Sequence, residues 1–152
     1  MIEQVIVAFG ASFGFGIIFN IKGIKLIFAS IGGSLSWFCY LYLNNNGMSI
    51  ILSLFISSII FSIYSEICAR YLKTPVTTLV ICALITLVPG AGMYETMYQT
   101  ILGNVSGALE LGLNTLASAG VLALGVIFVS TITRQVVNLK KVKEKLFEKK
   151  IL

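Results

Sequence analysis

The chain has 152 residues, of which 57% are hydrophobic and only 11% are charged. Soluble domains carry roughly 25% charged residues, and a soluble domain of this length cannot bury so much apolar surface. Composition therefore excludes a soluble globular protein and indicates an integral membrane protein. Its apolar runs are continuous rather than alternating, which favours membrane-spanning helices over a barrel.

Five apolar segments follow one another along the chain. They cover about residues 2–20, 26–43, 48–69, 74 to a break at Pro89, and 107–133. The first segment has Glu3 and no basic residue before Lys22, which is the wrong charge pattern for a cleaved signal peptide. We therefore expect it to remain as a helix. The fourth begins at Thr74, which can cap a helix, and Pro75, which suits the first helical position.

The basic residues predict the topology. With five crossings, the first loop, the third loop and the tail share one side, and all eleven Lys and Arg residues fall there. The positive-inside rule then places the N-terminus outside and the C-terminus in the cytoplasm. The sequence predicts an all-α integral membrane protein with five transmembrane helices, the fourth broken at Pro89. It would be a multi-pass protein of the cell (inner or plasma) membrane, with its transmembrane domain over residues 1–133.

Residues 134–152 form a basic tail with seven basic and two acidic side chains, which account for the whole net charge of +5. Nucleic-acid binding would need a basic surface on a folded domain, so we expect a cytoplasmic anchor and no nucleic-acid partner. The tail is also compatible with an amphipathic helix on the inner membrane surface, with a helix docked on a partner, or with a solvated tail. The apolar face of that helix would hold Val136, Leu139, Val142, Leu146 and Phe147.

Small residues at a spacing of four predict close helix packing. Gly10 and Gly14 form one such pair in the first segment, Ser12 and Gly16 form a second, and Ala29 and Gly33 form another in the second segment. In lipid, small side chains let helix backbones approach each other. These pairs predict packing within the chain or, alternatively, the face of a homo-oligomer.

The stretch LVPGAGMYETMYQ at residues 87–99 interrupts the fourth segment. Pro89 lacks an N–H, and in a helix its ring would clash with the carbonyl of Ile85. Gly90 and Gly92 permit unusual dihedral angles, and a second short helix is expected over about residues 93–102. A broken helix inside a membrane is tolerated where protein or a water-filled cavity satisfies its polar groups, and such breaks mark substrate sites in many transporters.

The residues around the break predict a substrate site. Free N–H groups of the second half-helix suit a carboxylate, and free carbonyls before Pro89 suit a cation. Glu95 is a candidate for binding a substrate amine or carrying a coupling proton, and Tyr94 and Tyr98 share a face that could wall a pocket. The alternative is a structural kink, with the tyrosines in the interfacial belt and Glu95 in outer water.

Two further pairs of polar residues lie in or beside the apolar segments. Asn114 and Ser118 are four apart and would line a polar seam or bond neighbouring helices. Glu66 and Arg70 are also four apart and can pair. An interfacial ion pair is favoured for them over a gate.

No complete enzyme motif is present. The chain has no histidine and no P-loop, and its one G-x-S-x-G match, from Gly10 to Gly14, lies inside the first apolar segment and has no histidine to act as its base. Its three cysteines have no metal-ligand spacing and are expected to be buried thiols. We expect no enzymatic activity, no metal and no cofactor.

The sequence LVPGAGMYETMYQTILGN, with the surrounding five-segment pattern, resembles the C-terminal membrane domain of the threonine/serine exporter family. It is most similar to small, separate-chain versions of that domain, as in two-component succinate exporters. The resemblance implies proton-motive-force-driven export of small amino acids or dicarboxylates. It also implies a second membrane subunit that supplies the missing N-terminal half. The alternatives are a non-transporting scaffold subunit and a passive channel, the latter disfavoured by the absence of a long polar stripe.

Overall fold

The computed structural model describes the backbone of residues 1–151 and the side chains of residues 1–137. Over this range it contains six α-helices and no strand, which confirms the all-α prediction. The helices are α1 (Ile2–Ile18), α2 (Ile24–Asn45), α3 (Ile50–Tyr71), α4 (Val76–Ile85), α5 (Gly90–Ile101) and α6 (Val105–Ile151).

Length and composition identify the spans. α2, α3 and the Val105–Val137 part of α6 are each long and apolar enough to cross a membrane. α4 and α5 pass the same test together, as a pair bent by 54°. α1 has 17 residues, at the lower end of the range of about 17–25 residues that suits a crossing. By length and composition, the described residues thus contain three clear apolar spans and one bent pair that could form a fourth, and a crossing by α1 stays a prediction.

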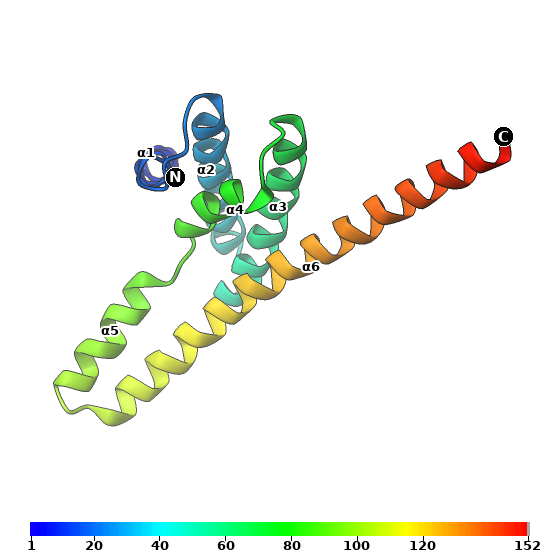
Figure 1. The fold of residues 1–152 in the computed structure, drawn as a ribbon. Helices are drawn as coiled ribbons and strands as arrows, with labels where there is room; N and C mark the ends of the chain where they lie inside the picture. The colour runs from blue at the N-terminus through cyan, green and yellow to red at the C-terminus, as the bar shows by residue number, and fades with distance from the viewer. Residues whose placement is uncertain (152) are drawn as a thin grey trace.

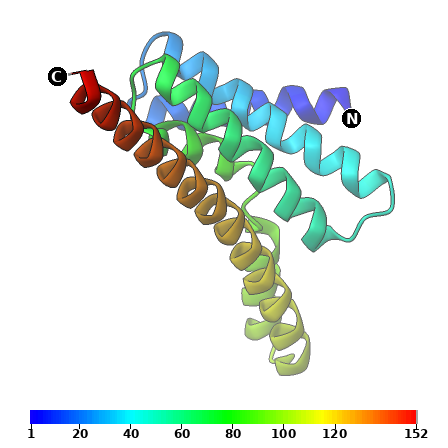
Figure 2. The ribbon, with the colours of Figure 1, turned by 90° about the vertical axis from the view of Figure 1, so that its right-hand side faces the viewer.

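The helices form a bundle and a projecting hairpin (Figure 1). α2 packs against α1, α3 and α4, so it lies at the centre of the bundle. α5 leaves the bundle and runs antiparallel to the first part of α6, and α6 then packs along α3. α6 continues as one nearly straight rod past the bundle (Figure 2).

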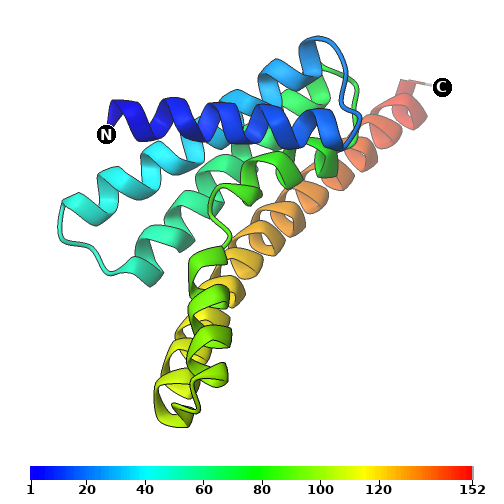
Figure 3. The same cartoon turned by 90° about the vertical axis from the view of Figure 1, so that its left-hand side faces the viewer.

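The basic loops lie together. The α1–α2 loop, which carries Lys22, and the α3–α4 loop, which carries Lys73, are at the same end of the bundle (Figures 2 and 3). We call this the basic end. The N-terminus and the α2–α3 loop lie at the other end. The bundle therefore places the charges as the positive-inside rule requires of a single membrane face.

Small residues set the close helix contacts. A Cβ atom on Gly33 of α2 would collide with the Ser12 hydroxyl of α1, and one on Gly125 of α6 would collide with the Ser58 hydroxyl of α3. Gly10 and Gly14 are different, because a Cβ on either would meet nothing within 4 Å. The Ser12 and Gly16 pair thus packs inside the chain, whereas the Gly10 and Gly14 pair faces away from it.

Hydroxyl groups connect α4 to the helices around it. Ser12 donates to the carbonyl of Cys82 at 3.1 Å, and Ser36 donates to the carbonyl of Ala83 at 3.1 Å. The Thr86 hydroxyl, just after α4, lies 2.9 Å from that of Ser36. Such bonds between helices stabilise membrane bundles. These three contacts attach the C-terminal end of α4 to both α1 and α2.

Three helix boundaries differ from the predicted ones. α4 begins at Val76 with Pro75 as its N-cap, and Thr74 does not cap it. α5 begins at Gly90 rather than near residue 93, because Pro89 occupies the N-cap and both glycines adopt helical conformation. α6 does not end near Thr133 but runs on to Ile151. The predicted tail is therefore continuous with the last span, and the side chains of its predicted apolar face from residue 138 onward lie outside the described residues.

Candidate functional site

The break between α4 and α5 follows directly from Pro89. α4 ends at Ile85, the residue whose carbonyl an N–H at position 89 would have met in a continuous helix. Leu87 and Val88 both donate to the carbonyl of Leu84, at 2.9 and 3.2 Å, and Gly90 donates to that of Val88 at 2.7 Å. The carbonyls of Thr86 and Leu87 accept none of these turn bonds.

The start of α5 supplies donors at the same place. Met93 donates to the carbonyl of Pro89 at 3.1 Å, which closes the first helical turn. The N–H groups of Ala91 and Gly92 precede that bond and have no partner within the helix. Together with the positive end of the helix dipole, these N–H groups favour an anionic group.

A cavity of about 450 Å³ opens at this break. Its walls come from α2, α3, the α4–α5 turn, the start of α5, and α6. The lining residues are Trp37, Tyr40, Ile50, Leu54, Leu87 to Gly92, Leu111, Asn114, Thr115 and Ser118. We call it the break cavity. Its volume is in the range of about 300–1,000 Å³ that is usual for small-molecule sites.

The break cavity brings together five of the predicted site residues. Pro89, Gly90 and Gly92 line one wall, and Asn114 and Ser118 line the α6 wall. Ser118 donates to the carbonyl of Asn114 at 2.9 Å. Gly92 also allows the close approach of α5 to α6, since a Cβ there would lie 2.5 Å from the Thr115 hydroxyl.

Tyr94, Tyr98 and Glu95 lie on other faces of α5 and are not among the lining residues. The tyrosine rings are stacked with their centroids 6.3 Å apart, and they are 69% and 46% exposed, so they face away from the bundle. The half-buried Glu95 carboxylate accepts a hydrogen bond from Gln99 at 3.2 Å.

The Glu95 bond begins a short polar chain along the hairpin. The Asn104 amide donates to Gln99 at 3.0 Å, and its own oxygen accepts from the Gly107 N–H at 3.2 Å. As expected, α5 ends near Gly103, which has a φ of 76° and donates to the carbonyl of Thr100 at 3.1 Å. These hydrogen bonds link Glu95 to the α5–α6 turn and not to the break.

Sequence reasoning missed Trp37 and Tyr40 of α2. Their rings lie 5.3 Å apart, and both line the break cavity. The i, i+3 spacing of two large aromatic residues beside the small residues of α2 was the available signal. However, nothing local to that helix indicates that this face meets a break some fifty residues further along.

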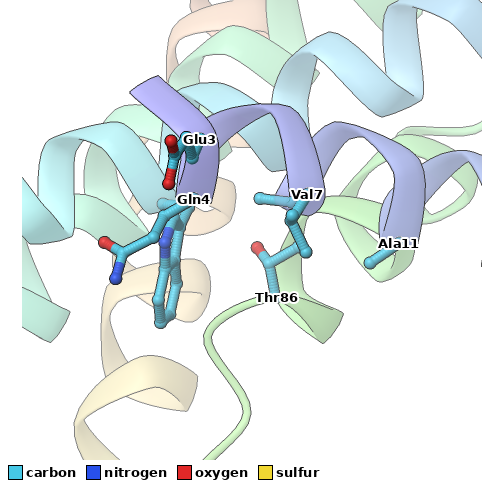
Figure 4. A pocket seen from close by; sticks show the side chains of 7 residues that line it. Glu3, Gln4, Val7, Ala11 and Thr86 are labelled. Carbon is cyan, nitrogen blue, oxygen red and sulfur yellow. The ribbon is translucent and has the colours of Figure 1, made fainter. Parts of the chain in front are cut away.

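Trp37 also lines a second cavity of about 400 Å³ between α1, α2 and the end of α4. Figure 4 shows Glu3 and Gln4 at one side of this cavity, with Thr86 opposite Val7 and Ala11. Trp37 therefore separates a cavity that reaches a carboxylate at the N-terminal end of α1 from the break cavity.

Glu66 and Arg70 pair as their spacing predicts, with 3.7 Å between carboxylate and guanidinium atoms. The Glu66 side chain is 14% exposed and that of Arg70 is 54% exposed. This pair lies at the basic end, away from the break cavity, and its surroundings are described below.

The break cavity can hold a small polar molecule by its ends. The unpartnered N–H groups of α5 suit a carboxylate, the carbonyl of Leu87 suits an ammonium group, and Asn114 and Ser118 offer further polar contacts. Trp37 and Tyr40 supply an apolar wall for a side chain. This arrangement binds and orients, and it contains no nucleophile paired with a base.

Comparison with known proteins bears on this site. The family model described as Threonine/Serine exporter, ThrE, matches residues 4–132, a range that begins in α1 and ends within α6. No curated protein and no solved structure matches the chain. Because the family model covers most of the sequence, the chain belongs to the threonine/serine exporter family.

Proposed function

We propose that this chain is one membrane subunit of a secondary exporter for threonine and serine, driven by the proton motive force. The break cavity carries this proposal, because it offers separate groups for a carboxylate and an ammonium within a broken span. Membership of the exporter family supports transport rather than catalysis. Succinate and other dicarboxylates are the alternative substrates, since they present the same carboxylate to α5.

The proposed orientation has the N-terminus outside, five crossings, and the basic end in the cytoplasm of a cell-membrane protein. The grouping of the Lys22 and Lys73 loops at one end supports this orientation. The break cavity would then open towards the outer half of the membrane, and the α5–α6 turn would face outward.

A second membrane subunit would complete the exporter. Gly10 and Gly14 support this part of the proposal, because no other part of the chain lies within 4 Å of a Cβ atom built at either position. Small residues at this spacing let another helix approach closely in lipid. The same face would serve a scaffold subunit that stabilises its partner without touching substrate. Changes at Pro89 and Tyr98 would then alter the yield of the complex, not its substrate dependence.

The decisive experiment is efflux from proteoliposomes that hold this chain with and without the co-expressed membrane subunit. An imposed proton gradient and threonine, serine and succinate as separate substrates would test coupling and selectivity. We expect gradient-dependent efflux of threonine or serine only from the two-subunit vesicles. Gradient-independent efflux, or equal efflux without this chain, would reject the proposal.

Glu95 is our candidate for the coupling proton. Replacing it in the Glu95→Gln variant should reduce gradient-driven export at least roughly tenfold, as removal of a proton-transfer group does, while the complex still assembles. Glu110→Gln is the matched control, since Glu110 is exposed on the same hairpin and lines none of the cavities described above. Unchanged export by Glu95→Gln would remove Glu95 from the coupling mechanism.

A further inference from the structure

A third cavity, of about 400 Å³, lies at the basic end between α3, the start of α4, and α6. We call it the inner cavity. Five of its ten lining residues are polar or charged: Glu66, Thr77, Ser130, Thr131 and Arg134. Its volume falls in the range of about 300–1,000 Å³ that suits a small ligand. None of these polar residues lines the break cavity.

The inner cavity presents opposite charges from different helices. Glu66 comes from α3 and Arg134 from α6, so the two charges face one space from separate walls. The contact of Glu66 with Arg70 measures 3.7 Å, longer than the roughly 2.7–2.9 Å of a charge-assisted hydrogen bond. The Glu66 carboxylate thus retains acceptor capacity for an ammonium group.

The start of α4 adds donors to the same cavity. Pro75, Val76 and Thr77 line it, and the N–H groups of Val76 and Thr77 precede the bond from Thr78 to the carbonyl of Pro75 at 3.2 Å. These N–H groups, the helix dipole and Arg134 together favour a carboxylate. The cavity therefore has one acidic part and one basic part, with hydroxyl groups between the walls.

Two helices, α3 and α6, line both the inner cavity and the break cavity. α4 begins at the first and leads to the second, and its ten residues span about 15 Å at roughly 1.5 Å per residue. Ser130 and Arg134 lie on the same α6 whose Asn114 and Ser118 line the break cavity. A packed cluster reaches both cavities: its members Leu54 and Leu87 line the break cavity, and Val80 and Val126, which pack against it, line the inner cavity.

We propose that the inner cavity is a second binding site for a zwitterionic amino acid, which holds the substrate on the cytoplasmic side before it reaches the break cavity. Glu66 receives the ammonium group, and Arg134 with the start of α4 receives the carboxylate. This inference rests on the proposed function, since it assigns the basic end to the cytoplasm and the substrate to small amino acids.

The test measures the rate of export from proteoliposomes that hold both subunits, as a function of the threonine concentration on the side that the basic end faces. Glu66→Gln and Arg134→Gln should each raise the half-saturating concentration roughly tenfold, because each removes one charged hydrogen bond, and should leave the maximal rate nearly unchanged. Lys73→Gln and Glu110→Gln are matched controls for the loss of one charge outside the cavity, and both should behave as wild type.

Substrate analogues separate binding from a structural effect. L-Threonine methyl ester lacks the carboxylate, and N-acetyl-L-threonine lacks the ammonium group. Wild type should prefer threonine over both as internal competitors. Arg134→Gln should lose preference against the ester only, and Glu66→Gln against the N-acetyl compound only. Glu66→Asp and Arg134→Lys, which keep the charges, should recover part of the affinity if the original variants assemble poorly.

The outcomes distinguish the two proposals. Wild-type export with unchanged half-saturation in both variants overturns the inner site and leaves the exporter standing. A lower maximal rate with unchanged half-saturation and unchanged analogue preference also overturns it, since that result describes a gate. Absence of export by wild type counts against the proposed function itself.

Discussion

At the scale of single residues, the cavities depend on side chains that serve two neighbours. Trp37 forms a wall of both the break cavity and the cavity that reaches Glu3. Gly92 lines the break cavity and also keeps α5 close to Thr115 of α6. The role of Gly92 differs from the predicted one: φ freedom was expected, whereas the structure places it inside a helix and uses its lack of a side chain.

Removing the Trp37 ring should connect the two cavities. In Trp37→Ala we expect the preference for threonine over a larger amino acid such as methionine to fall roughly tenfold, because about 1.4 kcal/mol of discrimination is lost with the wall. The relative efflux rates of threonine and methionine, when both are loaded into the same vesicles, measure this preference. Phe38→Ala is the control, since Phe38 is the adjacent residue, is 44% exposed and lines neither cavity. Retained selectivity in Trp37→Ala would show that Trp37 is not a wall of the substrate site.

At the scale of helices, the sequence predicts features that are determined within one helix better than features that depend on contacts between helices. Apolar runs predicted the three long spans, and Pro89 predicted the position of the break, because length and a missing N–H act within one helix. Asn114 and Ser118 were predicted from their spacing to line a polar seam or to bond neighbouring helices, and they line the break cavity. Tyr94 and Tyr98 share a face as predicted, but the side that this face meets depends on tertiary packing.

The buried serines of α3 show the same limit. Ser53, Ser57, Ser62 and Ser65 are buried, and their hydroxyls have no hydrogen-bond partner among the described residues. They do not share one side of α3, since Ser53 and Ser62 are nine residues apart and therefore about 180° apart around the helix. From the sequence alone, a serine in an apolar helix can equally face inward or outward. Only the neighbouring helices decide this, as Gly125 of α6 does by packing against Ser58.

The contact of α1 with α2 offers a test of helix packing. Gly33→Ala should destabilise the bundle by about 1–3 kcal/mol, as overpacking does, because the new Cβ collides with the Ser12 hydroxyl. Ser12→Gly in the same chain should restore part of the stability. Gly10→Ala, on the open face of α1, should cost little. Thermal unfolding of the purified protein in detergent measures all three, and equal losses at Gly33 and Gly10 would contradict this packing.

At the scale of the whole molecule, the charge pattern and the arrangement of loops give one topology. A fluorescent protein fused after Leu152 should fluoresce in the cytoplasm, and alkaline phosphatase inserted at Gly103 in the α5–α6 turn should be active outside. The opposite pattern at both sites would reverse the orientation, whereas active phosphatase at Gly103 together with a C-terminal fusion that does not fluoresce would require a different number of crossings.

The length of α6 has a mechanical consequence for such a molecule. Its 47 residues extend about 70 Å at roughly 1.5 Å per residue, more than twice the roughly 30 Å of a bilayer's hydrocarbon core. One end pairs with α5 beside the break, the middle lies on α3, and the rest continues without a turn. A rigid rod held at its middle acts as a lever. Any tilt of the hairpin that accompanies opening of the break cavity would move the far end of α6 in the opposite direction. A molecule bound to that end, beyond the membrane surface, would then respond to the state of the break cavity or restrain it.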